Sequence, residues 1–360
     1  SGSEVLKSSN KTTYNGNYGL NAQWTVYNGS KRLKTIEQEK LNNRVADLDV
    51  ATSENDIEQS IAQVYIQILY AAESVKVNEN TLQVSEAQRD RGKQLLDAGS
   101  IARSDYAQLE AQVSTDRYQL VTAQATLQDY KLQLKQLLEL DGEQEMQVYL
   151  PALGDENVLS PLPTKTDVFR SAVALRPEIE ASKLSVEASE LGIGIAKSGY
   201  LPSVSLTAGI GTNHTSGSDF TFGEQVKNGW NNSIGLSISV PIFNNRQTKS
   251  AVEKAKLQYQ TSQLTLLDEQ KTLYKTIEGL WLDANSAQQR YAAAIEKLHS
   301  TQTSYELVSE QFNAGMKNTV ELLTEKNNLL QAQQELLQSK YMAILNTQLL
   351  KFYQGDKITL

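Results

Sequence analysis

The chain has 360 residues, a net charge of −8 and no cysteine. The lack of cysteine excludes a disulfide framework and thiolate metal sites, and a negative charge without a basic cluster argues against a nucleic-acid surface. Hydrophobic residues make up 39% of the chain, which is low for a compact globule and favours long helices with narrow apolar seams. No apolar run reaches the roughly 18 to 20 residues that a membrane-spanning helix needs.

An internal repeat divides the chain. Residues 19–134 align without a gap with residues 235–350, at a constant offset of 216. Two copies, each far longer than a solenoid repeat, predict one architectural unit used twice. Residues 167–234 of the second copy would map before about residue 18 of the first, so we expect the first copy to lack one helix and one strand at its N-terminal side. Matches that carry the alignment are Tyr65 with Trp281, Leu82 with Leu298, Ala98-Gly99 with Ala314-Gly315, and Asp105 with Glu321.

The first predicted elements are a strand and a long helix. Residues 18–26 alternate between apolar side chains and small or polar ones, and this period of two predicts a strand with one apolar face. From Ser30 to Leu96 there is no proline and only one glycine, Gly92, and apolar residues follow a stripe close to a heptad repeat. This segment is predicted to be a helix of roughly 67 residues, about 100 Å long.

The long helix is expected to end at Ala98-Gly99, since glycine is a usual C-terminal stop. A returning helix comes next. Gly142 and the prolines from Pro151 to Pro163 interrupt the chain after it, and another helix is predicted over about residues 166–198.

Two further strands are predicted at residues 203–210 and 233–240, which alternate in the same way. All three strands have about 8 to 10 residues, the length of a tilted strand that crosses a bilayer. Aromatic residues stand near the strand ends, as in interfacial girdles. The alternative is a soluble antiparallel sheet with one buried face, and the strands alone do not decide between the two. The aromatic residues are Tyr18, Tyr27, Tyr200, Trp230 and Phe243.

The second copy repeats the long helix, the turn and the returning helix. Its apolar stripe runs from Ile277 to Phe312, and its turn lies at Ala314-Gly315. Ser104 and Thr319 are the predicted N-caps of the two returning helices, because hydroxyl side chains favour that position.

Residues suited to catalysis or metal binding are scarce. The two histidines, His214 and His299, lack the spacing of metal ligands. Gly192-Ile193-Gly194 is a fragment of a phosphate-loop pattern, because Lys197 takes the place of the third glycine. Carboxylates scattered along helical faces are typical of a solvated surface. We therefore expect no enzyme activity, no cofactor and no metal.

Four short motifs stand in a fixed order around the duplication. They are the two Ala-Gly turns, the strand start Tyr200-Leu201-Pro202 and the strand end Val240-Pro241-Ile242-Phe243-Asn244-Asn245-Arg246. In order and spacing they resemble the TolC-like outer-membrane efflux family, and the resemblance covers nearly the whole chain. Thr25 is a departure, because the second copy has Pro241 at the matching position.

The resemblance implies a mainly α fold with a β-barrel portion. A homotrimer would share a twelve-stranded transmembrane barrel, continued by a long antiparallel α-helical tunnel. The small polar face of each strand would line water, and the apolar face would meet lipid. The implied boundaries are a first repeat over residues 1–140, an equatorial connection over 141–165, a second repeat over 166–351 and a C-terminal tail over 352–360.

The resemblance also implies which residues form a gate. By alignment, Asp105 would be a gate acid and Lys317 its basic partner. Glu321 would face the entrance, and Phe312 would hold an aromatic gate position. Thr324 stands where the family has a second acid, and Lys317 replaces an arginine that could pair bidentately. In the family the glycine turns contact a periplasmic adaptor protein, so the implied docking residues are Ala98, Gly99, Ala314 and Gly315.

Together these features predict a passive exit duct of a tripartite efflux pump or a type I secretion system. We expect it in the outer membrane of a Gram-negative bacterium, with its helical part in the periplasm. Its expected partners are two further copies, a periplasmic adaptor, an inner-membrane transporter and outer-membrane lipid, with no nucleic acid. The alternative is a soluble or periplasmic coiled-coil scaffold. An enzyme on a helical frame is disfavoured by the lack of clustered acids, histidines and cysteines.

Overall fold

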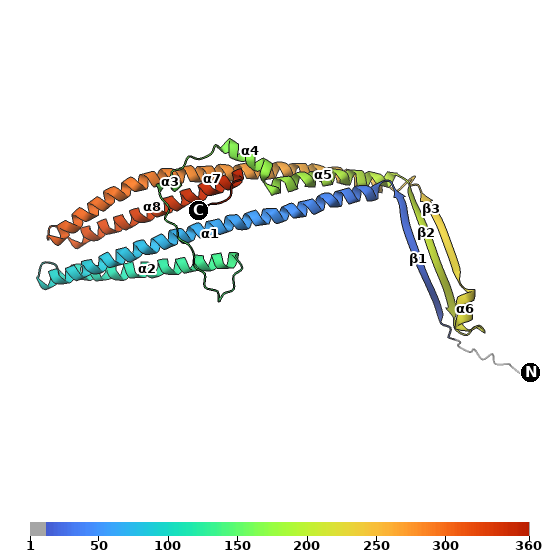
Figure 1. The fold of residues 1–360 in the computed structure, drawn as a ribbon, viewed down its shortest axis with the longest axis horizontal. Coiled ribbons are helices and arrows are strands. Elements are labelled where there is room, and N and C mark those ends of the chain that lie inside the picture. The colour runs from blue at the N-terminus through green and yellow to red at the C-terminus, as the bar shows by residue number, and fades with distance from the viewer. Residues whose placement is uncertain (1–11, 360) are drawn as a thin grey trace, which may run out of the picture. The chain divides into compact units, whose positions relative to one another are not determined.

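The computed structural model describes residues 12–359 of the chain. Most of these residues are helical, as predicted, and the strands form a three-stranded sheet (Figure 1). Two compact units are distinguished, Ser1–Val45 with Ser182–Leu266 and Ala46–Ala181 with Leu267–Leu360. The predicted beginning of the first copy lies before residue 12, outside the described residues. In the part of the chain that is described, no helix combines the length and apolar character needed to cross a membrane.

The sheet belongs to the first unit. Its strands β1 (Asn15–Asn28), β2 (Ser203–Thr215) and β3 (Asn231–Ser239) lie antiparallel in that order. The three predicted strands are therefore confirmed. A short helix, α6 (Phe222–Asn228), comes after β2 and packs against its end. The Gln225 side chain of α6 accepts from the Thr215 amide at 2.9 Å and donates to the Thr215 carbonyl at 3.2 Å.

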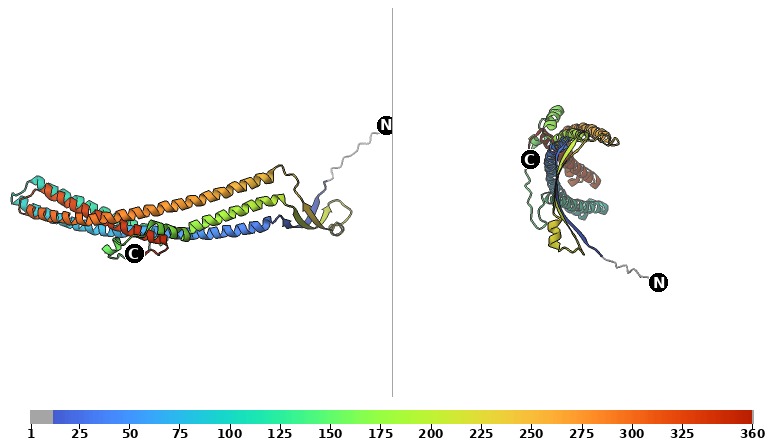
Figure 2. Two further views of the ribbon diagram at one scale, coloured as in Figure 1. Left: turned by 90° about the horizontal axis from the view of Figure 1, so that it is seen from above. Right: turned by 90° about the vertical axis from the view of Figure 1, so that its right-hand side faces the viewer.

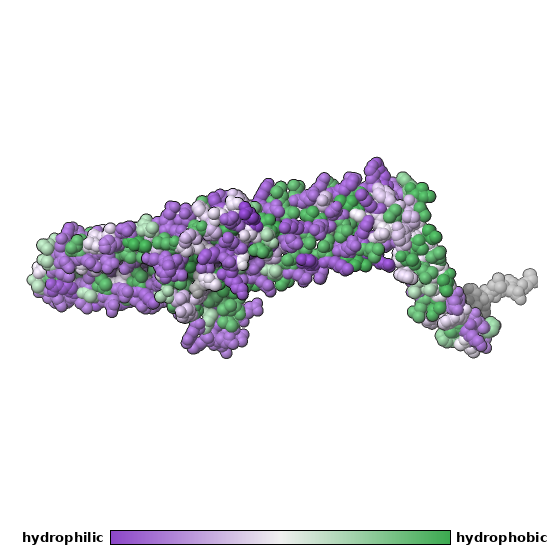
Figure 3. Space-filling model, turned by 45° about the horizontal axis from the view of Figure 1, so that its top comes forward, coloured by the Kyte–Doolittle hydropathy of each residue, from purple (hydrophilic) through white to green (hydrophobic). Residues whose placement is uncertain are grey.

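The register of the sheet sorts its side chains onto two different faces. One face is apolar and uncovered within the described residues: Ile234 is 85% exposed and Leu236 is 66% exposed. Figure 3 shows hydrophobic residues gathered over the strands. The opposite face carries small and polar side chains. Apolar rows join Leu20 to Ile210, Trp24 to Leu206 and Leu236, and Val204 to Ile238; polar rows join Asn21 to Gly209 and Ser233, Gln23 to Thr207 and Gly235, and Thr25 to Ser205 and Ser237.

One residue of β1 departs from the predicted alternation. The register shifts between Thr25 and Tyr27, so that Tyr27, and not Val26, is paired with Val204. A β-bulge inserts one extra residue into a strand, so that two of its residues lie opposite one residue of the partner strand. Val26 is the extra residue here, and Tyr27 takes the paired position opposite Val204.

Four long helices repeat the same pattern twice. The helix α1 (Lys31–Asp97) and the helix α2 (Arg103–Leu137) form one hairpin, and α7 (Gln247–Asn313) with α8 (Thr319–Gln354) forms the other. The helices α1 and α7 begin and end at matching positions of the two copies, and α2 and α8 begin at matching positions. Figures 1 and 2 both show the two hairpins side by side in the second unit, with their turns at the same end.

The passage from strand to long helix also has the same backbone twice. Gly29 and Ser30 before α1 have φ of 66° and 63°, and Asn245 and Arg246 before α7 have φ of 50° and 62°. These two left-handed pairs occupy matching positions of the internal repeat. A Cβ at Gly29 would lie 2.8 Å from the Leu201 Cβ, so glycine is needed there for space as well as for backbone freedom.

The predicted helix over 166–198 is broken in two at Arg176. Its ψ of 126° is extended, because the residue before a proline is disfavoured in the helical region. Arg176 is buried beside Tyr353, with the guanidinium 4.6 Å from the ring centroid. The elements of this region are α3 (Asp155–Val158), α4 (Lys165–Leu175), α5 (Pro177–Lys197) and the short 3-10 helix η1 (Ser198–Tyr200).

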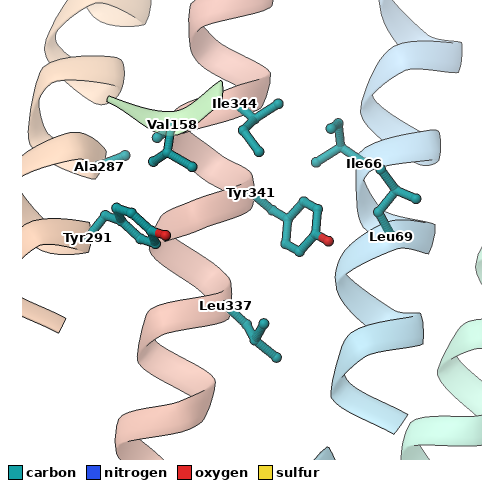
Figure 4. Packing of buried hydrophobic residues seen from close by; sticks show 9 residues of the cluster. Ile66, Leu69, Val158, Ala287, Tyr291, Leu337, Tyr341 and Ile344 are labelled. Carbon is teal, nitrogen blue, oxygen red and sulfur yellow. The ribbon is translucent and has the colours of Figure 1, made fainter. Parts of the chain in front are cut away.

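The main apolar core of the second unit lies where α8 packs between α1 and α7. Figure 4 shows Tyr341 and Ile344 of α8 pointing toward the α1 side of this cluster. The short helix α3 inserts Val158, which is fully buried. The cluster consists of Ile66 and Leu69 of α1, Val158 of α3, Ala287 and Tyr291 of α7, and Leu337, Tyr341, Ala343 and Ile344 of α8.

The irregular connection that contains α3 is tied to α7 by side chains that donate to its backbone. Gln288 donates to the carbonyls of Val158 at 2.9 Å and Ser160 at 2.8 Å. The Trp281 indole N–H donates to the Pro163 carbonyl at 3.0 Å. These bonds satisfy backbone groups that have no partner in a regular element.

Candidate functional site at the two helical turns

The turns that end α1 and α7 have the same backbone geometry. Gly99 and Gly315 are left-handed, with φ of 72° and 76°. The Gly99 and Ser100 amides donate to the carbonyls of Leu96 and Leu95, at 2.9 and 2.8 Å. In the second turn, Gly315 and Met316 donate to Phe312 and Gln311 at the same two distances. This is the Schellman motif, in which a left-handed glycine lets the last helical carbonyls be satisfied.

Both turns are open to solvent. The four predicted docking residues Ala98, Gly99, Ala314 and Gly315 are all exposed. No atom lies within 4 Å of where a Cβ would stand on either glycine, and the Met316 side chain is 71% exposed. The glycines are therefore required by the backbone conformation and not by lack of space.

The N-caps of the two returning helices lie two residues and one residue before the predicted positions. The helix α2 is capped at Ala102 and α8 at Asn318, so Ser104 and Thr319 lie within the first turns and the predicted caps are wrong. The reason is the acid at the third helical position. Asp105 accepts from the Ala102 amide at 3.3 Å, which fixes the start of α2 without a capping side chain at residue 102.

At α8 the capping is reciprocal. The Asn318 side chain accepts from the Glu321 amide at 2.9 Å, and the Glu321 carboxylate accepts from the Asn318 amide at 3.1 Å. The Lys317 ammonium donates to the other Glu321 oxygen at 2.7 Å. This hydrogen bond from Lys317, together with the one from the Asn318 amide, lowers the pKa of the Glu321 carboxyl below its ordinary 4.5. A capping box and an ion pair therefore share one side chain.

The predicted gate residues are placed differently from one another. Within the chain, Lys317 binds Glu321, whereas Asp105 caps α2. The spacing of four residues between Lys317 and Glu321, and the Asn-x-x-Glu pattern at 318–321, were signals for this arrangement. Asp105, Lys317 and Glu321 all lie close after the two glycines, at the starts of the returning helices.

Phe312 lies in a small apolar cluster beneath the turns. It is 3% exposed and packs with Leu109 of α2 and Leu322 of α8, which are 1% and 0% exposed. Leu95, Tyr305 and Leu323 pack against these three residues. The aromatic ring therefore holds the two hairpins together next to their turns.

Two features near the turns were missed in the sequence. Gly92 lies where α1 meets α2, because a Cβ there would stand 2.3 Å from the Leu109 Cδ1. Its signal was its position as the single glycine of a 67-residue helix. Asp116 and Lys326 form an ion pair buried between the hairpins. No local pattern announces that pair, since its members lie 210 residues apart.

Comparison with known proteins agrees with this architecture. Residues 1–139 and 168–355 match the family described as outer membrane efflux protein. The outer membrane protein TolC of Escherichia coli strain K12 is 25% identical over 335 residues, covering 89% of this chain and 66% of that protein. The alkaline protease secretion protein AprF of Pseudomonas aeruginosa is 23% identical, covering 82% of this chain and 60% of that protein.

The fold is also found in solved structures. A crystal structure of CusC superposes with a TM-score of 0.81 at 20% identity, covering 98% of this chain and 80% of that chain. The present chain spans less than two thirds of the length of the TolC and AprF proteins that it matches. The family match extends over most of the chain and includes the strands, both hairpins and both turns, so the chain belongs to the outer membrane efflux protein family.

Proposed function

We propose that the chain forms the passive exit duct of an efflux pump or a type I secretion system in the outer membrane of a Gram-negative bacterium. The observation that carries this proposal is the sheet with one exposed apolar face and one face of small polar residues. An apolar face of this size on a soluble monomer would be unusual. Against lipid on one side and water on the other, both faces are satisfied.

The same sheet supports an assembly of several copies. Within residues 12–359, β1 and β3 pair only with β2, so each leaves one edge without a strand partner. A sheet in a bilayer has to close, because unpaired backbone groups cannot be satisfied in lipid. We propose that three copies close the expected twelve-stranded barrel, and that β1, β2 and β3 are among the strands that each copy contributes. The two hairpins of each copy would then form the wall of a periplasmic tunnel.

The helical part is suited to such a wall. Figure 3 shows hydrophilic residues distributed widely over the helices. Large apolar side chains such as Tyr118 and Leu132 of α2 are nevertheless 74% and 62% exposed. Neighbouring copies in a trimer would cover such side chains. The two copies of the strand–helix–turn–helix unit would give each protomer two quasi-equivalent wall segments. A soluble scaffold explains the hairpins but leaves the apolar sheet face without a role.

The two turns would contact the adaptor. Ala98, Gly99, Ala314 and Gly315 are exposed, repeated and small, so that the tip of a helical hairpin could approach their backbone closely. The adaptor would join the duct to an inner-membrane transporter, which would supply the energy. The duct would carry out no chemistry.

Asp105, Lys317, Glu321 and Phe312 would control the entrance. Phe312 holds the hairpins together, and the charged residues stand at the starts of the returning helices. In the resting trimer we propose that Asp105 and Lys317 help to keep the entrance closed. An exposed ion pair is worth about 0 to 1 kcal/mol, so three symmetry-related copies together would bias the gate by about 0 to 3 kcal/mol. The upper end corresponds to roughly a 150-fold change in the ratio of open to closed channels.

Planar-bilayer recording tests both the duct and its gate. The purified protein is expected to conduct ions, and Asp105→Ala and Lys317→Ala are each expected to raise the mean conductance. Lys297→Ala is the matched control, because Lys297 forms a similarly exposed ion pair with Glu335 at 2.7 Å, away from the turns. Unchanged conductance in both gate variants would overturn the gating proposal, and absence of any conductance would overturn the duct.

A further inference from the structure

A buried cluster of polar side chains joins the two hairpins. The Lys326 ammonium of α8 pairs with the Asp116 carboxylate of α2, and the Ser85 hydroxyl of α1 donates to the same carboxylate oxygen. Gln112 donates to the other oxygen of Asp116 at 2.9 Å. The side chains of Lys326 and Asp116 are only 5% and 1% exposed. This cluster therefore holds two opposite charges in the interior of the helical unit.

Ion pairs within each hairpin are more exposed than this one. Lys297 and Glu335 join α7 to α8 within one hairpin and are 45% and 41% exposed. Arg117 and Glu86 join α2 to α1 within the other and are also exposed.

A second ion pair also crosses between the hairpins. Lys340 of α8 and Glu73 of α1 lie 3.3 Å apart, with side chains that are 14% and 29% exposed. The Lys326 pair is the more deeply buried of these two crossing pairs.

The internal repeat did not produce this pair. At the offset of 216, the counterpart of Asp116 is the buried Ala332, and the counterpart of Lys326 is Glu110. The first hairpin supplies the acid and the second supplies the base. The cluster therefore distinguishes two hairpins that are otherwise built alike.

The position of the cluster along the helices also matters. Lys326 lies eleven residues beyond Gly315, and Asp116 lies seventeen residues beyond Gly99. At a rise of 1.5 Å per residue, this is roughly 16 to 26 Å from the turns. The apolar cluster around Phe312 lies between the buried charges and the turns.

The apolar cluster around Phe312 and the buried charged cluster respond differently when the helices move relative to one another. Apolar contacts are non-directional, so residues of the Phe312 cluster that are displaced along the helices can still bury apolar surface against new neighbours. Separating a buried ion pair leaves each charge uncompensated in the interior, which is strongly unfavourable. Burial also lowers the pKa of Lys326, against the opposing effect of the Asp116 carboxylate, so the lysine depends on its partner to stay charged. The buried charged cluster is consequently the more rigid of the two.

We propose that Ser85, Asp116 and Lys326 form a positioning site that fixes the register of α2 against α8. This site would confine movement of the turns to the helical segments that lie between it and the turns. Its consequence for gating rests on the proposed duct function, whereas the fixed register is a property of the helical unit itself. Buried polar residues are best known for specifying register in helical assemblies.

A distance measurement between the two turns tests the register directly. The chain has no cysteine, so Ser100→Cys and Met316→Cys introduce two unique spin-label sites in the exposed turns. Pulsed electron paramagnetic resonance is recorded in detergent, with labelled chains diluted by unlabelled ones. With the native cluster, one narrow distance distribution is expected. In Lys326→Met the single narrow peak should be lost, because the Asp116 charge remains buried without its partner.

A second variant covers the case in which Lys326→Met fails to fold. Asp116→Leu combined with Lys326→Met replaces the ion pair by apolar side chains. Such a replacement of a buried ion pair often leaves the stability of the folded state unchanged or raises it. This double variant should fold and still show a broadened or doubled distance distribution. Lys297→Met is the matched control, since it removes an exposed pair within one hairpin, and it should keep the narrow distribution.

A narrow, native-like distribution in the apolar double variant would overturn the proposal. Conductance of the same samples separates this result from the function of the duct. A non-conducting protein whose register depends on the cluster would leave this inference standing and overturn the proposed function. A conducting protein that keeps its register without the cluster would overturn this inference and leave the proposed function standing.

Discussion

At the scale of single residues, the two turns are built by the same two devices. A left-handed glycine ends each long helix, and an acid at the third position of the returning helix accepts from the backbone amide of the N-cap residue. The second turn adds Lys317, which shares the Glu321 carboxylate with the cap. The start of α8 therefore depends on the ionised form of one exposed side chain.

This dependence predicts how the start of α8 responds to acid. The folded chain lowers the pKa of Glu321 below 4.5, so its cap should be fully present above that pH and be lost as the pH falls through the lowered pKa. Hydrogen exchange at the first turn of α8, corrected for intrinsic rates, should show constant protection from pH 7 to about 5 and a loss below 4.5. In Glu321→Gln, whose amide does not titrate, the profile should be flat. Identical pH profiles in the two proteins would contradict the assignment.

Single residues also show what the sequence could and could not predict. Gly99 and Gly315 were placed correctly, because a glycine that comes after a long apolar stripe is a local signal. Ser104 and Thr319 are not the caps, because the acid at the third helical position fixes each helix start whether or not a hydroxyl side chain stands nearby. The burial of Phe312 could not be predicted, since it depends on residues of two other helices.

At the scale of elements, the long helices of the hairpins follow from the spacing of apolar residues in the sequence. The breaks and close contacts of these helices follow from local backbone geometry and packing. The bounds of α1 agree within one residue with the helix predicted from Ser30 to Leu96. The break between α4 and α5 is set by Pro177, which divides the single helix predicted over about residues 166–198. Gly92 does not break α1, and its lack of a side chain is required by the Leu109 side chain of the neighbouring helix α2.

Two glycine substitutions should separate packing from helix propensity. In Gly92→Ala the new methyl group would meet the Leu109 side chain, which is buried, so α1 and α2 must shift or Leu109 must change rotamer. Overpacking of this kind costs about 1 to 3 kcal/mol, against a gain of about 1 kcal/mol in helix propensity. Gly279→Ala in α7 is the control, because nothing lies within 4 Å of its Cβ position.

Thermal unfolding in detergent distinguishes the two substitutions. Gly279→Ala should raise the midpoint, as expected for alanine in an open helical position, and Gly92→Ala should lower it or leave it unchanged. An equal rise in both variants would show that Gly92 has no packing role.

At the scale of the whole molecule, two features of the chain are incomplete in isolation. The sheet exposes large apolar residues on one face, and both of its outer edges lack a strand partner within the described residues. The alternation of β1, β2 and β3 was readable in the sequence because the period of two is a strong signal. The proposed closure into a barrel is not readable there, because it would require other copies of the chain. That proposal rests on the family relationship and on the exposed face.

Electron microscopy of the detergent-extracted protein tests the central claim most directly. The proposed duct predicts hollow particles with three-fold symmetry, in which a short barrel continues into a long helical tube. The protein should also require detergent to remain dispersed, because the apolar sheet face has to be covered. Monomeric rods that stay soluble without detergent would contradict the duct and favour a coiled-coil scaffold.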